Sequence, residues 1–172
     1  MAIKRTTKRK LSTVNYTRRK TGLFGPIYRQ FENKPREAMK YLQKVKEGEC
    51  PKAFYREDIG YVDIVWGECD QKAKNGKGFG LEHILIDHGD EIKQLNINPI
   101  DFLILIFNVG KLKMEENGTN RIYLEGETFR MVITTKFSKF NKKLILTAFD
   151  LRKIYIKNPK RAKQLQKRAS NQ

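Results

Sequence analysis

The sequence of 172 residues has little of what marks a disulfide-rich, zinc-binding or membrane-spanning protein. Its only two cysteines, Cys50 and Cys69, lie in unrelated contexts, with neither a CxxC pair nor a histidine at ligand spacing. We therefore expect no zinc site, no other metal site and no need for an oxidising compartment. The most apolar run, residues 100–109, is too short to span a bilayer and contains Asp101 and Asn108.

The first residues are basic and lack the apolar stretch of a secretory signal, so we expect a cytoplasmic protein. Motifs of several enzyme classes are missing as well. There is no P-loop, the glycines near residue 78 do not follow a strand as in dinucleotide-binding proteins, and no serine or cysteine nucleophile stands beside a histidine.

Acidic residues are absent from both ends of the chain. Residues 1–20 carry eight basic side chains and residues 157–172 carry six, and together they hold fourteen of the seventeen excess positive charges. Basic segments on a nearly balanced body favour binding to a polyanion, with nucleic acid first and an anionic membrane surface second. Solubilising tails without a ligand are the alternative. A membrane surface ranks last, because residues 158–172 offer only Leu165 as a bulky apolar anchor.

These charges divide the chain into three parts. We expect a mobile basic arm over residues 1–24, an α+β domain over residues 25–156, and a basic tail over residues 157–172 that could form a helix.

The first half of the body predicts a helix between strands. Residues 27–31 suggest a short strand, and Asn33-Lys34-Pro35 starts a helix that Gly48 ends. Its buried stripe would be Ala38, Tyr41, Leu42 and Val45. Residues 50–55 and 61–66 alternate as two strands.

A second helical region begins at Asn98-Pro99 and ends at Gly110, although its apolar residues on every face also permit a strand. From residue 111 onward the period is two. Residues 111–115, 121–125, 128–136 and 143–149 predict four strands of an antiparallel meander, which residues 151–156 either continue or leave as a helix. The fold class is thus α+β, with helices on one face of an antiparallel sheet and the other face or its edge free for a ligand.

Both histidines of the chain lie in one amphipathic segment, residues 78–90. Leu81 and Ile84 define a buried helix face, and His88 falls on the same stripe. His83 projects to the opposite side, and Gly89 would cap the helix. An inward His88 could serve as a general acid or base, or be a hydrogen-bonded core histidine. The ranking of the two histidines reverses if the side carrying Ile86 faces inward.

The predicted meander carries basic and hydroxyl side chains at regular intervals: Arg121, Tyr123, Arg130, Thr134, Thr135, Lys136, Lys142, Lys143 and Thr147. Opposite a helix-borne histidine, such a surface suits metal-free RNA cleavage. That reaction needs a group to take the 2′-OH proton, a group to protonate the 5′-oxygen, and cations to stabilise the phosphate. Asp63 lies in the middle of a strand, where pairing with a lysine or arginine is expected over catalysis. The second proton carrier stays open among Asp63, Tyr123 and a lysine.

Several segments together resemble the phage-associated barnase/EndoU/colicin/RelE-like nuclease family. They occur in the family's order and are KPREAMKYL, DIVWG, GLEHILIDH, NRIYL and LILTAF. The resemblance covers about residues 25–150 and implies a small α+β ribonuclease fold with metal-independent endoribonuclease activity and no cofactor. Matching positions are Asp63, Trp66, His83, His88, Arg121 and Thr147. Where the family often has tryptophan before the last motif, this chain has Leu144, which changes packing.

The resemblance therefore implies an endoribonuclease that acts on RNA in a host cell, as a phage or mobile-element toxin or effector. His88 is the leading acid or base with His83 second, Arg121 clamps the phosphate, and Thr147 supplies a hydroxyl. Four further side chains would bind substrate: Arg130, Tyr123, Lys136 and Lys143. An acidic inhibitor protein is a candidate partner. The competing hypothesis is a nucleic-acid-binding or phage structural protein that keeps the fold without the chemistry.

Overall fold

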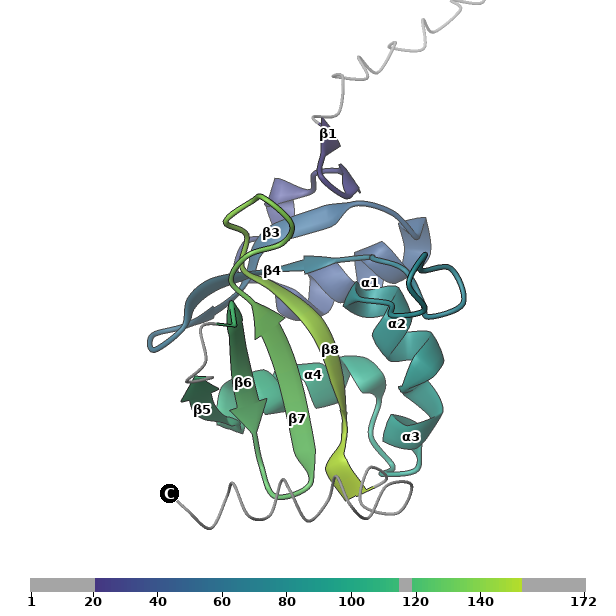
Figure 1. Ribbon diagram of the computed structural model, residues 1–172, viewed down its shortest axis with the longest axis vertical. Coiled ribbons are helices and arrows are strands. Elements are labelled where there is room, and N and C mark those ends of the chain that lie inside the picture. Colours follow the sequence, from purple (N-terminus) through teal and green to yellow (C-terminus); the bar gives the residue numbers. More distant parts are fainter. Residues whose placement is uncertain (1–20, 115–118, 153–172) are drawn as a thin grey trace, which may run out of the picture.

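The computed structural model describes residues 21–114 and 119–152 (Figure 1). The helical elements are a 3-10 helix η1 (Arg29–Phe31) and the α-helices α1 (Pro35–Val45), α2 (Gly80–Asp87), α3 (Gly89–Lys93) and α4 (Pro99–Val109). The strands are β1 (Thr21–Gly22), β2 (Gly25–Pro26), β3 (Glu49–Arg56), β4 (Gly60–Val65), β5 (Lys111–Met114), β6 (Arg121–Glu125), β7 (Phe129–Thr134) and β8 (Leu144–Asp150).

Six of the strands form one sheet in the order β3-β4-β8-β7-β6-β5. The predicted meander from β5 to β8 is confirmed, and all its neighbouring pairs are antiparallel. The sheet continues through β4 to β3, but β4 joins β8 in parallel and only at Asp63 and Leu144. The fold is therefore α+β with a mostly antiparallel sheet, and it has one parallel junction that the sequence did not predict.

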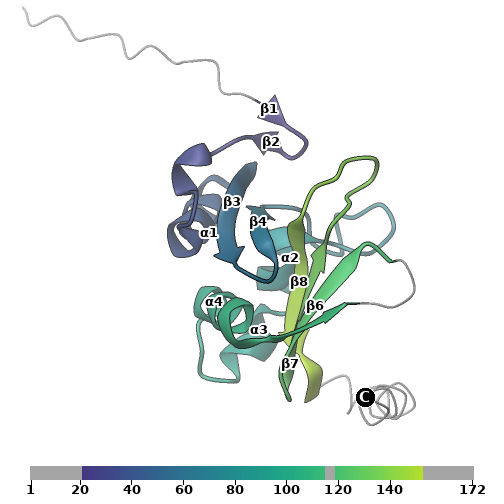
Figure 2. The same ribbon diagram turned by 90° about the vertical axis from the view of Figure 1, so that its left-hand side faces the viewer.

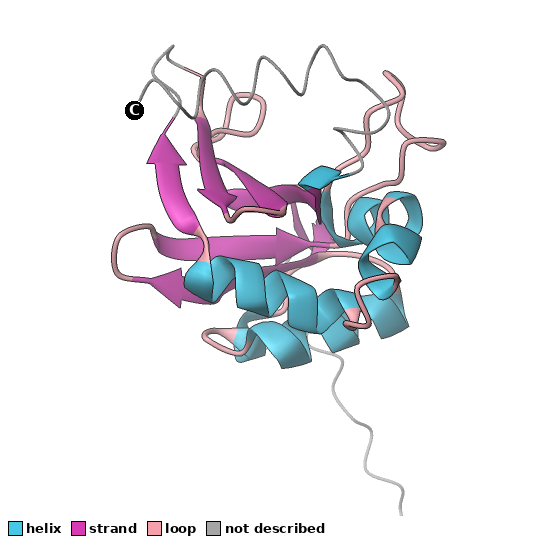
Figure 3. Cartoon of the chain, turned by 90° about the horizontal axis from the view of Figure 1, so that it is seen from below, coloured by secondary structure: helices cyan, strands magenta, loops and turns pink. Residues whose placement is uncertain are grey.

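Helices α1 and α4 cover one face of this sheet, α1 against β3 and β4 and α4 against β6 and β7 (Figures 2 and 3). Both helices begin as expected. Pro35 occupies the first turn of α1, where its missing N–H costs nothing, and the Asn98 side chain caps α4 by accepting from the Ile100 N–H. Leu103 and Phe107 of α4 are fully buried, so the apolar segment is a core helix and not a strand.

Three local predictions are wrong. Residues 27–31 form no strand: Tyr28 donates its N–H to Glu49, and the chain then turns into η1. Helix α1 ends at Lys46 in a left-handed conformation, before Gly48 is reached. Gly89 caps nothing, because it is the buried first residue of α3 and His88 separates the two helices.

Helix α2 enters the space that opens where β4 and β8 diverge beyond their single pair of partners. It contacts α1 and β4 on one side and β8 on the other. On the β8 side the strand has a bulge at Leu146, because Val132 pairs with Thr147 while Ile133 pairs with Ile145. The bulged part of β8 therefore faces α2, which is covered by α1 and β4 on its other side. The candidate site lies where α2 and β8 meet.

The ends of the described chain bear on the expected arms. Residues 21–24, assigned to the arm by charge, belong to a hairpin in which β1 pairs with β2. Residues 1–20 and 153–172, and with them all fourteen basic side chains of the two end segments, lie outside the described residues. Leu151 and Arg152 are helical, and the rest of the 151–156 segment lies outside as well. Within the described ranges, no helix is both long and apolar enough to cross a membrane.

Candidate functional site

His83 is held between α2 and β8 by hydrogen bonds to both ring nitrogens. Its Nδ1 lies 2.8 Å from Asp87 Oδ2, one helical turn ahead, and its Nε2 lies 3.1 Å from Thr147 Oγ1 on β8. Because a carboxylate can only accept, Nδ1 carries a hydrogen and donates it to Asp87. This fixes the ring, and Nε2 is the atom that shares a proton with the Thr147 hydroxyl.

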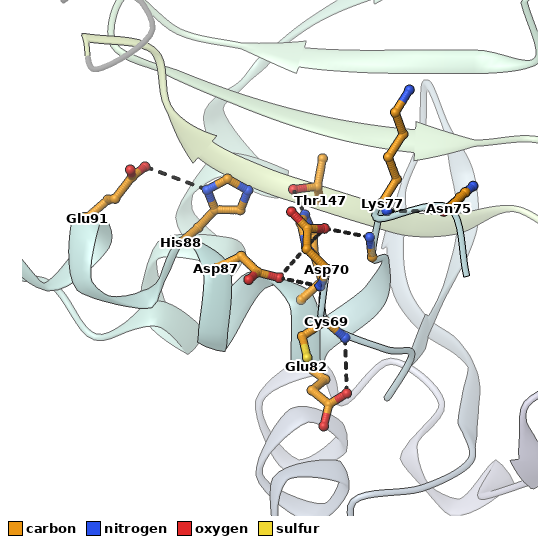
Figure 4. Close-up of polar contacts among 11 residues, drawn as sticks. Cys69, Asp70, Asn75, Lys77, Glu82, Asp87, His88, Glu91 and Thr147 are labelled. Atoms are coloured by element: carbon orange, nitrogen blue, oxygen red, sulfur yellow. Dashed lines mark hydrogen bonds and ion pairs between the residues drawn. The ribbon is translucent and has the colours of Figure 1, made fainter. Parts of the chain in front are cut away.

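His88 lies beside His83 with its ring perpendicular, at a centroid distance of 4.9 Å, and 5.6 Å from the Phe149 ring. Figure 4 shows His88 on the side of α2 that faces Thr147, with Glu91 beyond it. Its Nδ1 makes no hydrogen bond among the described residues, and the nearest carboxylate oxygen, from Glu91, is 3.6 Å away. Burial, followed by the charge of neighbouring His83, lowers the pKa of His88, against the opposing effect of Glu91. The lowered pKa favours the neutral form of the His88 ring, which suits a base at neutral pH.

The expected orientation of His83 is wrong. Its side chain is 9% exposed and contacts β8, whereas the His88 side chain is 23% exposed. The expectation assumed that α2 buries one face only. In fact Leu81 and Ile84 pack into the core while the His83 side packs against β8, and Ile86 is the residue that faces solvent. Both histidines therefore belong to one site.

A loop before α2 supplies the second carboxylate at His83. Asp70 Oδ1 lies 3.2 Å from His83 Nδ1 and accepts the Gly78 N–H, while the Asp70 N–H binds Asp87 (Figure 4). Buried Glu82 anchors the same loop by accepting from the Cys69 N–H and from Lys72. The loop is thus tied to α2 at two carboxylates, and it places Asp70 beside Nδ1 of His83.

The two ends of that loop approach so closely that they require glycine. Gly67 has φ +73°, and a Cβ there would lie 1.9 Å from the Phe79 carbonyl oxygen. A Cβ at Gly78 would lie 2.3 Å from the Glu68 carbonyl oxygen. Glu68 and Phe79 exchange both backbone hydrogen bonds across this gap, so the glycines set the geometry that brings Asp70 to His83.

Among the described residues, Asp70, His83 and Asp87 form a group that could hold a cation. One ring nitrogen and one oxygen of each carboxylate lie within 4.8 Å of one another. One oxygen of each carboxylate is already engaged: Asp70 Oδ1 accepts from Gly78, and Asp87 Oδ2 accepts from Asp70 and His83. A cation would have to displace the Nδ1 proton of His83 and these hydrogen bonds. The chemistry of the cluster as it stands is that of a hydrogen-bonded imidazole.

Asp63 is paired with a lysine and lies apart from the histidines. Its Oδ2 is 3.0 Å from Lys142 Nζ, its Oδ1 accepts the Lys52 N–H, and Lys142 also contacts buried Glu49 at 3.0 Å. Burial opposes the charge of Lys142, but the hydrogen bonds to Asp63 and Glu49 outweigh it and raise the pKa of Lys142. This network joins β3, β4 and the start of β8, and it stabilises their junction.

The sheet register places Tyr123 and Thr147 on either side of Val132, on the face away from α4. Tyr123 pairs with Val132, and Val132 pairs with Thr147, so the three side chains share that face. Arg130 shares it too, but it forms an ion pair with Glu125 and its guanidinium lies 5.2 Å from the Tyr123 ring. Arg130 is therefore partly neutralised.

The remaining predicted residues lie farther away. Arg121 is exposed on the same face, two residues along β6 from Tyr123, and backbone spacing puts it about 12 Å from Thr147. Lys136 is exposed in the loop between β7 and β8, and Lys143 donates to the Ile59 carbonyl. The structure thus brings His83, His88 and Thr147 together, and it does not bring Arg121, Asp63, Lys136 or Lys143 to them.

Sequence reasoning missed Asp70, Asp87 and Glu91. Asp87 had a local signal, because it lies four residues after His83 on one helix face. Glu91 lies three residues after His88, a spacing that bridges the short break between α2 and α3. Asp70 had no local signal, since only the folded loop brings it to the histidine.

The sequence was also compared with known proteins. A profile of the phage-Barnase-EndoU-ColicinE5/D-RelE like nuclease family matches residues 53–154, more than half of the chain. The matched range contains α2 and β8, and with them His83, His88 and Thr147. No curated protein and no solved structure gives a match.

Proposed function

Since the chain belongs to the phage-Barnase-EndoU-ColicinE5/D-RelE like nuclease family, we propose that it is an endoribonuclease that cuts RNA without a metal ion. In the proposed reaction the 2′-oxygen attacks the adjacent phosphorus, and the bond from phosphorus to the 5′-oxygen breaks. One group must take the 2′-OH proton, and another must protonate the 5′-oxygen. The observation that carries the proposal is the contact between His83 and His88, two imidazoles in different environments, one of which is hydrogen-bonded to Thr147.

His88 is the proposed base. Its lowered pKa leaves the ring neutral at pH 7, and it is the more exposed of the two imidazoles. Glu91 lies on the Nδ1 side, so the other ring nitrogen, Nε2, would take the proton of the 2′-OH. Two titratable groups whose surroundings differ in this way suit opposite roles in one reaction.

His83 is the proposed proton donor, acting through Thr147. Because Nδ1 is held by Asp87, a protonated His83 presents its Nε2–H to Thr147 Oγ1. The Thr147 hydroxyl would give its proton to the departing 5′-oxygen and receive the Nε2 proton in return. His83 then ends neutral and His88 ends protonated, and the next solvent exchange or hydrolysis of the cyclic product restores both.

Phosphate binding is assigned to the face of the sheet that Thr147 shares with Tyr123. Arg121 is exposed on this face but lies about 12 Å from Thr147, which suits a neighbouring phosphate better than the scissile one. Arg130 would have to exchange Glu125 for a phosphate, and Lys136 and Lys143 would contact the strand beyond the site. Arginine favours such contacts because it binds phosphate oxygens in pairs.

RNA is the proposed substrate, and a phage or mobile-element toxin acting in a host cell is the proposed role. An acidic inhibitor protein would fit the charge of the chain as a partner. The alternative function is a nucleic-acid-binding or phage structural protein without chemistry. The two functions differ in what the imidazoles do, since a binding protein needs no pair of histidines with unequal environments.

The test is cleavage of a mixed RNA pool in EDTA by the wild type, His88→Gln and His83→Asn, with RNA binding and thermal unfolding measured in parallel. Amide side chains keep a hydrogen-bonding group at each position. We expect each variant to lose about 10²–10⁴-fold in rate, the usual contribution of a general acid or base, while RNA binding and folding persist.

Three other outcomes are informative. Cleavage that appears only when Mg²⁺ or Mn²⁺ is added would replace the metal-free mechanism with one at Asp70, His83 and Asp87. Cleavage that survives His88→Gln and not His83→Asn would make His83 the base. Salt-sensitive binding by the wild type, with no cleavage of any RNA class, would support the binding protein.

A further inference from the structure

A groove of about 740 Å³ lies at the start of β8, between the β1–β2 hairpin, β4 and the loop between β7 and β8. Figure 1 shows this loop at the same end of the molecule as β1 and β3. The groove is lined by residues 21–23, Tyr61, Asp63 and residues 140–143, and neither histidine takes part. It is therefore separate from the site at α2.

Aromatic rings are exposed along this groove. Tyr61 is 40% exposed and Phe140 is 44% exposed, and Tyr55, next to Tyr61 with a centroid distance of 4.8 Å, is 54% exposed. Each of the two lining rings has a lysine beside it: Lys52 Nζ lies 4.9 Å from the centroid of Tyr61, and Lys139 Nζ lies 5.6 Å from that of Phe140. Exposed rings next to ammonium groups offer stacking faces and counter-charges together.

The charge around the groove is positive. The carboxylates at its base, Asp63 and Glu49, are both bound to Lys142, so that lysine balances part of their charge. Residues 134–149 contain four lysines and no acidic residue. The segment of residues 1–20, with eight basic side chains and no acidic one, joins the body at Thr21, which itself lines the groove.

The groove and the proposed catalytic site lie on the same face of the sheet. Asp63 pairs with Leu144, Leu144 with Thr134, and Thr134 lies two residues from Val132, the partner of Thr147. Side chains of paired residues, and of residues two apart, point to one face. Lys143 directly precedes β8, and because Leu146 is an extra bulge residue it lies about three strand spacings, or about 10 Å, from Thr147. About three stacked nucleotides cover that distance.

We propose that this groove is an accessory binding site for a single RNA strand, in which bases stack on Tyr61 and Phe140 and phosphates meet the lysines. This inference rests on the proposed function, because it extends the substrate of that site toward the start of β8. Aromatic rings in a positive groove bind single strands with little sequence preference, since every base has a face that stacks. A base-paired duplex keeps its bases inside and would use only the charges.

The binding test uses a labelled 2′-O-methyl oligouridine of about 12 nucleotides, which cannot be cut through a 2′-OH, and an abasic oligomer of the same length and charge. The wild type should bind the base-bearing oligomer about tenfold more tightly, or about 1.4 kcal/mol. The double variant Tyr61→Ala/Phe140→Ala should lose this difference and still bind both oligomers through charge. Leu105→Ala is the matched control, because Leu105 is as exposed as Phe140 and lies on α4, on the opposite face.

Equal wild-type affinity for the two oligomers, or an unchanged preference in the double variant, overturns the proposal whether or not the protein cuts RNA. A competition with polyglutamate can also overturn it. If polyglutamate displaces the oligomer from the wild type, and binds the double variant more weakly than it binds Leu105→Ala, the groove suits an acidic protein. Cleavage adds an independent readout: the double variant should raise KM about tenfold for long RNA and leave dinucleotide cleavage unchanged. If the wild type cuts no RNA, the proposed function fails. The comparison of the two oligomers still shows whether the groove binds a single strand by stacking its bases.

Discussion

At the scale of single residues, the contact between Asp87 and His83 determines what the imidazole can do. Asp87 accepts from Nδ1, and so leaves Nε2 for Thr147. An amide in place of this carboxylate can donate as well as accept, and it no longer favours one tautomer or a charged ring. We expect Asp87→Asn to lower kcat about 10–100-fold, the cost of losing one charge-assisted hydrogen bond.

Asp90→Asn is the control for this change. Asp90 lies three residues after Asp87 in the sequence and is exposed. Among the described residues its carboxylate pairs only with Lys93, at 3.2 Å. It should keep wild-type kcat. Equal rates for the two variants would show that Asp87 has no part in positioning His83.

The pH dependence of the proposed reaction depends on His88. Its pKa is lowered by burial and by His83, and raised in part by Glu91. A base must be deprotonated, so activity should fall as pH drops through this lowered pKa. Glu91→Gln removes a negative charge that favours the protonated ring, so the pKa and the acidic limb of the rate profile should both move to lower pH. Nuclear magnetic resonance titration of the His88 ring measures the same pKa without relying on activity.

Glu57→Gln is the control, because Glu57 is exposed in the turn between β3 and β4. It should change neither the acidic limb of the rate profile nor the pKa measured for the His88 ring. An upward shift with Glu91→Gln would mean that Glu91 does not act on His88 as a charge.

At the scale of elements, the loop before α2 depends on Gly67. In Gly67→Ala the Cβ meets the Phe79 carbonyl and the backbone keeps a positive φ, so we expect a loss of about 2–3 kcal/mol in the free energy of unfolding. Gly76→Ala is the matched control, since Gly76 has φ +65° with nothing within 4 Å of an added Cβ, and should cost about 1 kcal/mol. Urea denaturation of both variants checks the difference. Equal losses of unfolding free energy in the two variants would show that the contact of the added Cβ with Phe79 does not destabilise the protein.

Elements with local signals were predicted, and contacts between elements were not. Three features depend only on neighbouring residues in the sequence: the Asn98 cap of α4, the start of α1 at Pro35, and the alternating pattern of β6 to β8. All three are confirmed. The orientation of His83 depends on β8, more than sixty residues away, and the position of Asp70 depends on a folded loop. The β4–β8 junction rests on one residue pair, for which alternation gives no signal.

At the scale of the whole molecule, charge is concentrated at the two ends of the chain while the body is nearly balanced. If these segments bind RNA, they release counterions, and affinity falls with salt by about 0.7 in log–log slope for each phosphate contacted on a single strand. Changing the eight lysines and arginines of residues 1–20 to glutamine should therefore reduce the slope by up to about 6. Binding titrations over a range of salt measure it, and an unchanged slope would assign those residues to solubility alone.

The central claim is that the 2′-OH of RNA is the nucleophile and that His88 and His83 move the protons. The most direct measurement is mass spectrometry of the product ends after digestion of a defined RNA in EDTA. We expect 2′,3′-cyclic phosphate and 5′-OH ends from the wild type, and intact RNA with His88→Gln over the same time. Products with 5′-phosphate and 3′-OH ends, or digestion that requires a divalent cation, would contradict it.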